Sequence, residues 1–115
     1  MAFTPIKTHK IVTTGTHSTI AIDTSELLTR GINSGRWQVR ITTITVSAAM
    51  LMGTDSTVEA SVAVASAKLT GQNTHMLAGT VELFDLPTGI THISAEGFAA
   101  GPGEMWITVG FGEKI

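Results

Sequence analysis

Apolar and polar residues alternate with a period of two along several short stretches of the chain. The clearest stretch has apolar residues at every odd position from Met105 to Phe111, with Trp106 and Thr108 between them. Successive side chains of a β-strand point to opposite faces, so this period predicts a strand with one buried face.

A second stretch, residues 37–52, alternates in the same way but changes phase. Its apolar positions are odd from Trp37 to Ile41 and even from Ile44 to Met52. One extra residue in a strand produces such a change, so the pattern predicts a β-bulge or bend at Thr42-Thr43. Residues 53–55 (GTD) then predict a turn.

The N-terminal third has two interpretations. Residues 6–23 fit a hairpin with a three-residue loop at 13–15 and a left-handed Gly15, which sets Ile6 opposite Ile22. This register gives one apolar face containing Ile6, Val12, Ile20 and Ile22. The alternative is that residues 1–10 form an extended arm. Residues 24–30 (TSELLTR) predict one helical turn and residues 31–35 a loop.

The remaining segments complete a strand-rich pattern. Residues 81–86 predict a strand, 87–89 (PTG) a turn, 90–95 the return strand, and 97–103 a loop. Residues 56–69 fit a helix that begins with a Ser56–Glu59 capping box, but they also alternate like a strand; strand plus loop is preferred because Thr and Val are frequent.

Seven or eight short strands in 115 residues predict one all-β domain, an antiparallel two-sheet sandwich of the jelly-roll type. Composition limits the classes of function that this protein can have. Charged residues make up 14% and the net charge is −2, which gives no electrostatic reason to bind nucleic acid. There is no cysteine, no signal-peptide pattern in residues 1–10 and no membrane-length apolar run, so we expect a protein made in the cytoplasm that binds no membrane.

No catalytic, cofactor or metal site is predicted. The four histidines (His9, His17, His75, His92) show no convergent ligand spacing, and residues 101–103 (GPG) lack the third glycine of a phosphate loop. No nucleophile-elbow motif is present, and the acidic pairs Glu82/Asp85 and Glu96/Glu104 are interpreted as solvated charges.

Six residues are candidates for a protein interface instead. Met50 and Met52 are adaptable side chains suited to contact surfaces, and Trp37 and Trp106 suit either core or interface packing. Phe3 and Pro5 lie in a segment that we expect to extend onto a neighbouring subunit.

A family resemblance adds to this picture. The order of GRWQVRI (35–41), LMGTD (51–55), LAGTVELF (77–84), THIS (91–94) and ITVGFGE (107–113) resembles small β-sandwich virion proteins of tailed double-stranded DNA phages. It is most similar to the jelly-roll decoration, or cementing, proteins of short-tailed phages. Residues 35–113 carry the resemblance, and residues 1–34 are not matched.

The resemblance implies a non-enzymatic protein that binds the outside of a phage capsid as a homodimer or homotrimer. Its partner would be the major capsid protein, whose joints it would reinforce, and its location would be the virion. A head–tail or tail component is an alternative. Other classes remain open: a carbohydrate-binding sandwich with Trp37 or Trp106 exposed beside polar groups, and a hydrolase with converging His, Ser and Asp.

Overall fold

The computed structural model describes residues 3–60, 74–99 and 101–112. Two short helical segments, α1 (Ser25–Thr29) and the 3-10 helix η1 (Ser34–Arg36), interrupt a series of strands. The eight strands of the described residues are β1 (Phe3–Thr13), β2 (Ser18–Ala21), β3 (Trp37–Ile44), β4 (Ala48–Gly53), β5 (Thr74–Met76), β6 (Val81–Asp85), β7 (His92–Gly97) and β8 (Gly103–Gly112).

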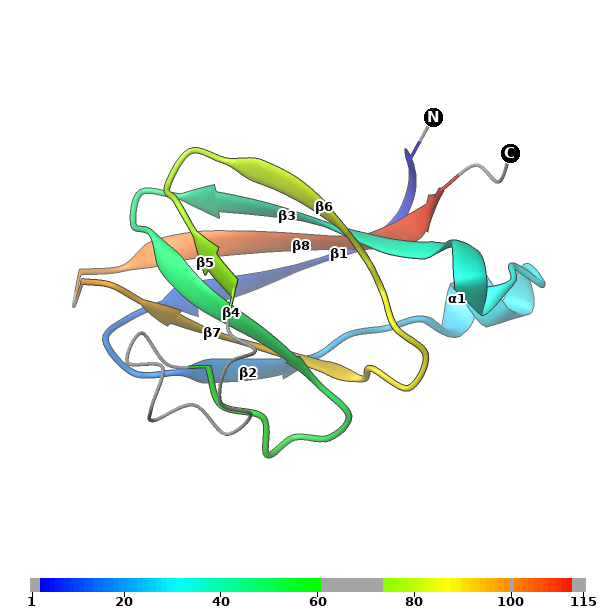
Figure 1. The fold of residues 1–115 in the computed structure, drawn as a ribbon, viewed down its shortest axis with the longest axis horizontal. Helices are drawn as coiled ribbons and strands as arrows, with labels where there is room; N and C mark the ends of the chain where they lie inside the picture. Colours follow the sequence, from blue (N-terminus) through cyan, green and yellow to red (C-terminus); the bar gives the residue numbers. More distant parts are fainter. Residues whose placement is uncertain (1–2, 61–73, 100, 113–115) are drawn as a thin grey trace.

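These strands form two four-stranded antiparallel sheets that face each other (Figure 1). The first sheet has the order β1-β8-β3-β6 and the second has the order β2-β7-β4-β5. Consecutive strands lie on opposite sheets, except β4 and β5, which pair with each other in the second sheet. This strand order is that of an eight-stranded jelly roll. The all-β sandwich expected from the alternating pattern is therefore confirmed.

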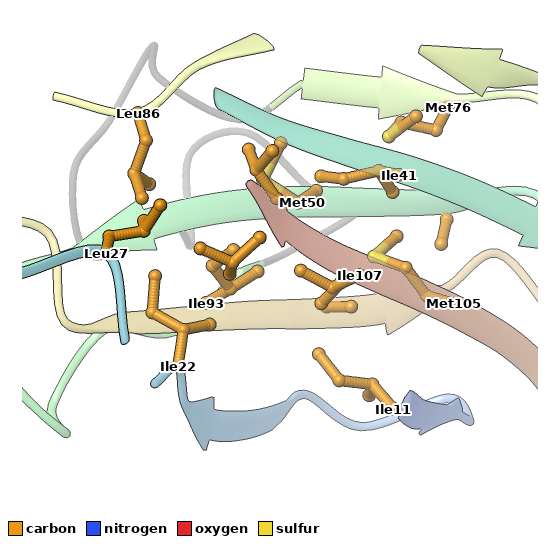
Figure 2. Packing of buried hydrophobic residues seen from close by; sticks show 14 residues of the cluster. Ile11, Ile22, Leu27, Ile41, Met50, Met76, Leu86, Ile93, Met105 and Ile107 are labelled. Atoms are coloured by element: carbon orange, nitrogen blue, oxygen red, sulfur yellow. The ribbon is translucent and has the colours of Figure 1, made fainter. Parts of the chain in front are cut away.

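The alternating residues meet between the sheets. Met105, Ile107 and Val109 of β8 are fully buried and point toward β4 and β7 of the second sheet, where Met50 and Ile93 meet them (Figure 2). Leu27 of α1 closes one end of this core. Burial of such side chains contributes roughly 1.5–3 kcal/mol each, so this shared core is the main source of stability.

The phase change in residues 37–52 has a different cause from the one predicted. The pairing of β3 with β8 runs without a shift from Trp37 to Ile44, so the bulge predicted at Thr42-Thr43 is wrong. The chain instead turns three residues later, where Thr45 adopts a φ of 73° and the chain leaves the first sheet for the second. The alternation has one phase in β3 and the other in β4. The two strands belong to different sheets, and each sheet directs its own apolar side chains toward the core.

The predicted hairpin over residues 6–23 is also wrong. β1 pairs with β8, with Ile11 opposite Met105, whereas β2 pairs with β7 in the other sheet. Of the four residues predicted to share one apolar face, Ile6, Ile20 and Ile22 do pack on the core, whereas Val12 points outward and Ile11 is buried instead. The extended-arm alternative does not describe residues 3–10 either, because they belong to β1.

Several local predictions are confirmed. The helical turn forms as α1, the loop at 97–103 separates β7 from β8, and the turn at 87–89 has Gly89 at φ 92°. The return strand exists as β7, but it does not pair with β6, because the turn leads into the second sheet.

Residues 56–60 contain neither helix nor strand, and residues 61–69 of the ambiguous segment lie outside the described residues. In the part of the chain that the structure describes, no helix has the length and apolar content needed to cross a bilayer.

Candidate functional site

The outer face of the first sheet carries several side chains that the described residues leave exposed. Met105, Ile107 and Val109 point inward, so the residues between them on β8 point outward. Residues paired across antiparallel strands share a face, and the register therefore assigns the whole surface. We call it the outer face: Thr8, Lys10 and Val12 of β1, Glu104, Trp106 and Thr108 of β8, Arg40, Thr42 and Ile44 of β3, and Val81 and Leu83 of β6.

Five large apolar side chains of the outer face are exposed to solvent. Val81 is 60% exposed, Leu83 47% and Trp106 38%, and the other two are Val12 and Ile44. One row of the register runs Lys10, Trp106, Thr42, Val81 across all four strands. Several exposed apolar side chains gathered on one face are typical of interaction sites, whereas single exposed apolar residues are ordinary.

Trp106 lies in a fixed polar frame at the centre of the outer face. Its Nε1 donates a hydrogen bond of 3.0 Å to Glu104 Oε1, and Lys10 Nζ lies 5.4 Å from the centre of its ring. Lys10 Nζ and Glu104 Oε2 are 3.9 Å apart. The three side chains hold one another, so the indole presents an oriented apolar surface rather than a freely rotating one.

Phe3 and Arg40 extend the same face toward the start of β1. The Arg40 guanidinium lies 5.3 Å from the centre of the Phe3 ring. Beside them, the hydroxyls of Thr8 and Thr108 share a hydrogen bond of 3.1 Å. Phe3, proposed from sequence as part of an arm, thus belongs to the margin of this face as a strand residue.

The second sheet differs because the chain covers its outer side. Leu51 of β4 packs there with Val58 and Ala60, all of them buried. Ala60 N–H donates to Ser94 Oγ over 2.9 Å, and Thr19 Oγ1 donates to the Val58 carbonyl over 2.8 Å. Among the described residues, the chain therefore buries the outer side of the second sheet and leaves the outer side of the first sheet open.

The structure separates the six interface candidates. Trp106 and Phe3 lie on or beside the outer face, and Pro5 is exposed on β1. Met50 is only 2% exposed inside the core, so its assignment to an interface is wrong. Trp37 packs against the core and donates its Nε1 hydrogen to the Ile32 carbonyl over 3.1 Å.

Met52, the last candidate, is partly buried and lines a pocket of about 220 Å³ with Pro87 and Ile90. The pocket's walls carry no ionisable side chain among the lining residues, which are Met50, Leu51, Met52, Thr74, Pro87 and Ile90. It is an apolar indentation near the end of β4 and offers no acid, base or nucleophile.

The histidines lie far apart in different settings. His17 is 3.8 Å from Glu59, His75 packs edge-on against Phe98, and His92 Nδ1 lies 2.8 Å from Thr91 Oγ1. Among the described residues, no group of three His, Cys, Asp or Glu side chains is placed to hold a metal ion.

His9, Asp23 and Ser25 do lie together, but their bonds are not those of a catalytic triad. His9 Nε2 accepts the backbone N–H of Asp23 over 3.1 Å, while Ser25 Oγ donates to Asp23 Oδ1 over 2.6 Å. A triad needs the histidine bonded to the nucleophilic hydroxyl. The Ser25 hydroxyl bond and then the Ser25 backbone bond lower the pKa of Asp23, as expected for a turn carboxylate.

The exposed apolar residues of β6 and β3 were missed in the sequence. Val81, Leu83 and Ile44 have the apolar character of core positions, and alternation alone does not say which of two faces is the covered one. The usable signal was that residues 81–84 contain three apolar side chains and one acid without strict alternation.

Comparisons with known proteins add to the fold only. No protein-family model matches the chain, and no curated protein matches it. A solved structure, the solution NMR structure of a de novo designed double-stranded β-helix, matches with a TM-score of 0.51 over 90% of this chain and 99% of that one. The two sequences are 13% identical, so the likeness supports the fold and carries no function.

Proposed function

We propose that this protein is a non-enzymatic structural protein that docks on a larger protein assembly through the outer face of its first sheet. The observation that carries the proposal is the set of exposed apolar side chains on the outer face, Trp106 among them, opposite a sheet whose outer side the chain covers. Interfaces are enriched in aromatic residues at their centres, with charged groups around them. Trp106 framed by Lys10 and Glu104 has this composition.

The assembly we propose is a phage capsid, with the protein acting as a decoration protein on its exterior and the major capsid protein as its partner. Support for this choice comes from the resemblance of residues 35–113 to such proteins. A jelly-roll sandwich with an open sheet face suits a role that requires rigidity and broad contact rather than a reactive cleft.

Binding to undecorated capsids tests the proposal. Purified protein is mixed with capsids of a short-tailed phage that lacks its decoration protein, and the capsids are pelleted. We expect saturable co-sedimentation and a higher disruption temperature, because a ligand that binds only the intact shell stabilises it. Protein that stays in the supernatant at every concentration would contradict the capsid proposal.

Two variants locate the contact. Trp106→Ala should weaken binding by about tenfold or more, as is common for a central interface tryptophan. Phe98→Ala is the matched control, because Phe98 is an exposed aromatic outside the outer face. Equal losses for both variants, or none for Trp106→Ala, would refute docking through this face.

Carbohydrate binding is the second candidate, since Trp106 is exposed beside a carboxylate and an ammonium group. A sugar that stacked on the ring would have to displace Lys10, which already lies over it. Titration of tryptophan fluorescence with an oligosaccharide library distinguishes the two: a saturable change that Trp106→Ala abolishes, without capsid binding, would favour the carbohydrate.

A further inference from the structure

We propose that β6 is a dimerisation strand, which pairs antiparallel with β6 of a second copy of this chain across a two-fold axis at Leu83. β6 is an edge of the first sheet: it pairs with β3 on one side, and no strand of the described residues pairs on its other side (Figure 1). The proposal does not depend on what the outer face binds.

The direction of the backbone groups follows from the hydrogen bonds at the two ends of β6. Leu86 N–H donates to the Trp37 carbonyl over 3.0 Å, and Thr43 N–H donates to the Thr80 carbonyl over 3.1 Å. Residues of an antiparallel strand direct their N–H and C=O groups alternately to one neighbour and the other. The even residues therefore bond with β3, and Val81, Leu83 and Asp85 direct theirs to the free edge.

One two-fold register satisfies all of these free groups. With Leu83 opposite Leu83 of the second copy, Val81 lies opposite Asp85 in both halves, and every outward N–H of the three residues meets an outward C=O. Residues that lie opposite each other in this register point to the same side of the combined sheet, so the core-facing sides of the two copies are on the same side. Glu82 then lies opposite Phe84, so no two like charges face each other directly.

The opposite edge of the same sheet is less suited to pairing. β1 contains Pro5, which has no N–H, and its register shifts between Pro5 and Lys7. Lys7 and Lys10 add charge along it. Proline, bulges and lysine are the features that keep natural edge strands unpaired, whereas β6 pairs with β3 in an uninterrupted register.

Pairing would also enlarge the outer face. The four strands have 11, 10, 8 and 5 residues, and at a spacing of about 4.8 Å they cover roughly 500 Å², less than the roughly 800 Å² that each partner contributes to a standard interface. A continuous eight-stranded sheet doubles this surface and brings the two copies of Leu83 and Val81 together at its centre. The short β6 contact alone predicts a weak dimer.

Sedimentation velocity over a range of concentrations tests the dimer with the full chain. We expect the wild type to dimerise reversibly at high concentration, with slower exchange of the Leu83 amide hydrogen in the dimer. Leu83→Lys sets two like charges directly opposite and should raise the dimer dissociation constant by about tenfold or more. Leu28→Lys, at an exposed leucine on α1, should leave it unchanged.

Two further variants test whether a loss of dimerisation is caused by loss of folding, and whether the dimer uses a different interface. Leu83→Pro removes an N–H that points away from β3, so it should abolish the dimer while the cooperative unfolding transition remains. Glu82→Gln removes the diagonal repulsion between two Glu82 side chains about 7–8 Å apart and should tighten the dimer. A monomeric wild type at millimolar concentration, or a dimer indifferent to Leu83→Lys, would overturn the proposal.

Discussion

Gly110 lies where β1 crosses closest to β8, opposite Pro5 in the register. A Cβ atom at this position would collide with the Thr4 carbonyl oxygen and would lie 2.8 Å from Cζ of Phe3. A backbone oxygen cannot move aside without shifting the strand, so this glycine permits the close contact between β1 and β8.

Gly110→Ala should therefore lower the free energy of unfolding by about 1–3 kcal/mol, the usual cost of overpacking a filled site. Gly101→Ala is the matched control: a Cβ there meets no atom within 4 Å, and the change should stay within about 0.5 kcal/mol. Urea denaturation measures both. Equal stability of the two variants would contradict the close approach of the strands.

His9 accepts a backbone hydrogen bond from Asp23, which only the unprotonated Nε2 can do. Partial burial, and then the nearby positive charge of Lys7, lower the pKa of His9, while Asp23 opposes them. The unfolded chain, with an ordinary histidine pKa near 6.5, binds a proton before the folded chain does.

Stability should therefore fall as pH decreases from about 6.5 toward the lower pKa of folded His9. His9→Gln keeps an acceptor but cannot titrate, so it should remove this part of the pH dependence. Urea midpoints of both proteins at pH 8 and pH 5 provide the measurement. Parallel pH profiles for wild type and variant would show that His9 does not contribute.

At the scale of elements, the outer sides of the two sheets are covered to different extents. Residues 54–60 cover the second sheet through backbone-to-side-chain hydrogen bonds and three buried apolar residues. On the first sheet the row from Lys10 to Val81 remains open to solvent. This asymmetry is the basis on which we propose the outer face as a docking surface.

Ser94→Ala should release the covering segment. The change leaves the buried N–H of Ala60 without its acceptor, which costs about 1–3 kcal/mol, and it should speed hydrogen exchange of the Ala60 amide. Thr16→Ala, at an exposed hydroxyl, is the control. If exchange of Ala60 stayed as slow as in the wild type, another contact would have to hold the segment.

At the scale of the whole molecule, both sheets depend on one core. Ile41 of the first sheet and Ile93 of the second are both fully buried in the same cluster. A small domain with a shared core unfolds in one cooperative step. Neither sheet keeps its inner face buried once the other is removed.

Ile41→Ala and Ile93→Ala should each lower the free energy of unfolding by about 2–5 kcal/mol. In each variant the transition followed by far-ultraviolet circular dichroism should coincide with the one followed by tryptophan fluorescence. Val12→Ala, on the outer face, should change little. Separate transitions in either variant would mean that the sheets unfold independently.

The sequence alone indicated most local states of this protein: the strands other than β5, the positions of α1 and of the turns at 53–55 and 87–89, and an all-β sandwich. Alternation and turn residues are local properties, so they can be recognised without the fold. The sequence also identified Trp106 as a candidate interface residue, but it did not predict which side chains surround it.

Only the tertiary structure decided which strands pair and which face is open. The hairpin over residues 6–23 failed because β1 and β2 belong to different sheets, and the bulge at Thr42-Thr43 failed because the chain changes sheets at Thr45. An apolar residue such as Leu83 has the same local pattern whether its face is covered or bare. Its exposure depends on segments far away in the sequence, and that information is not local.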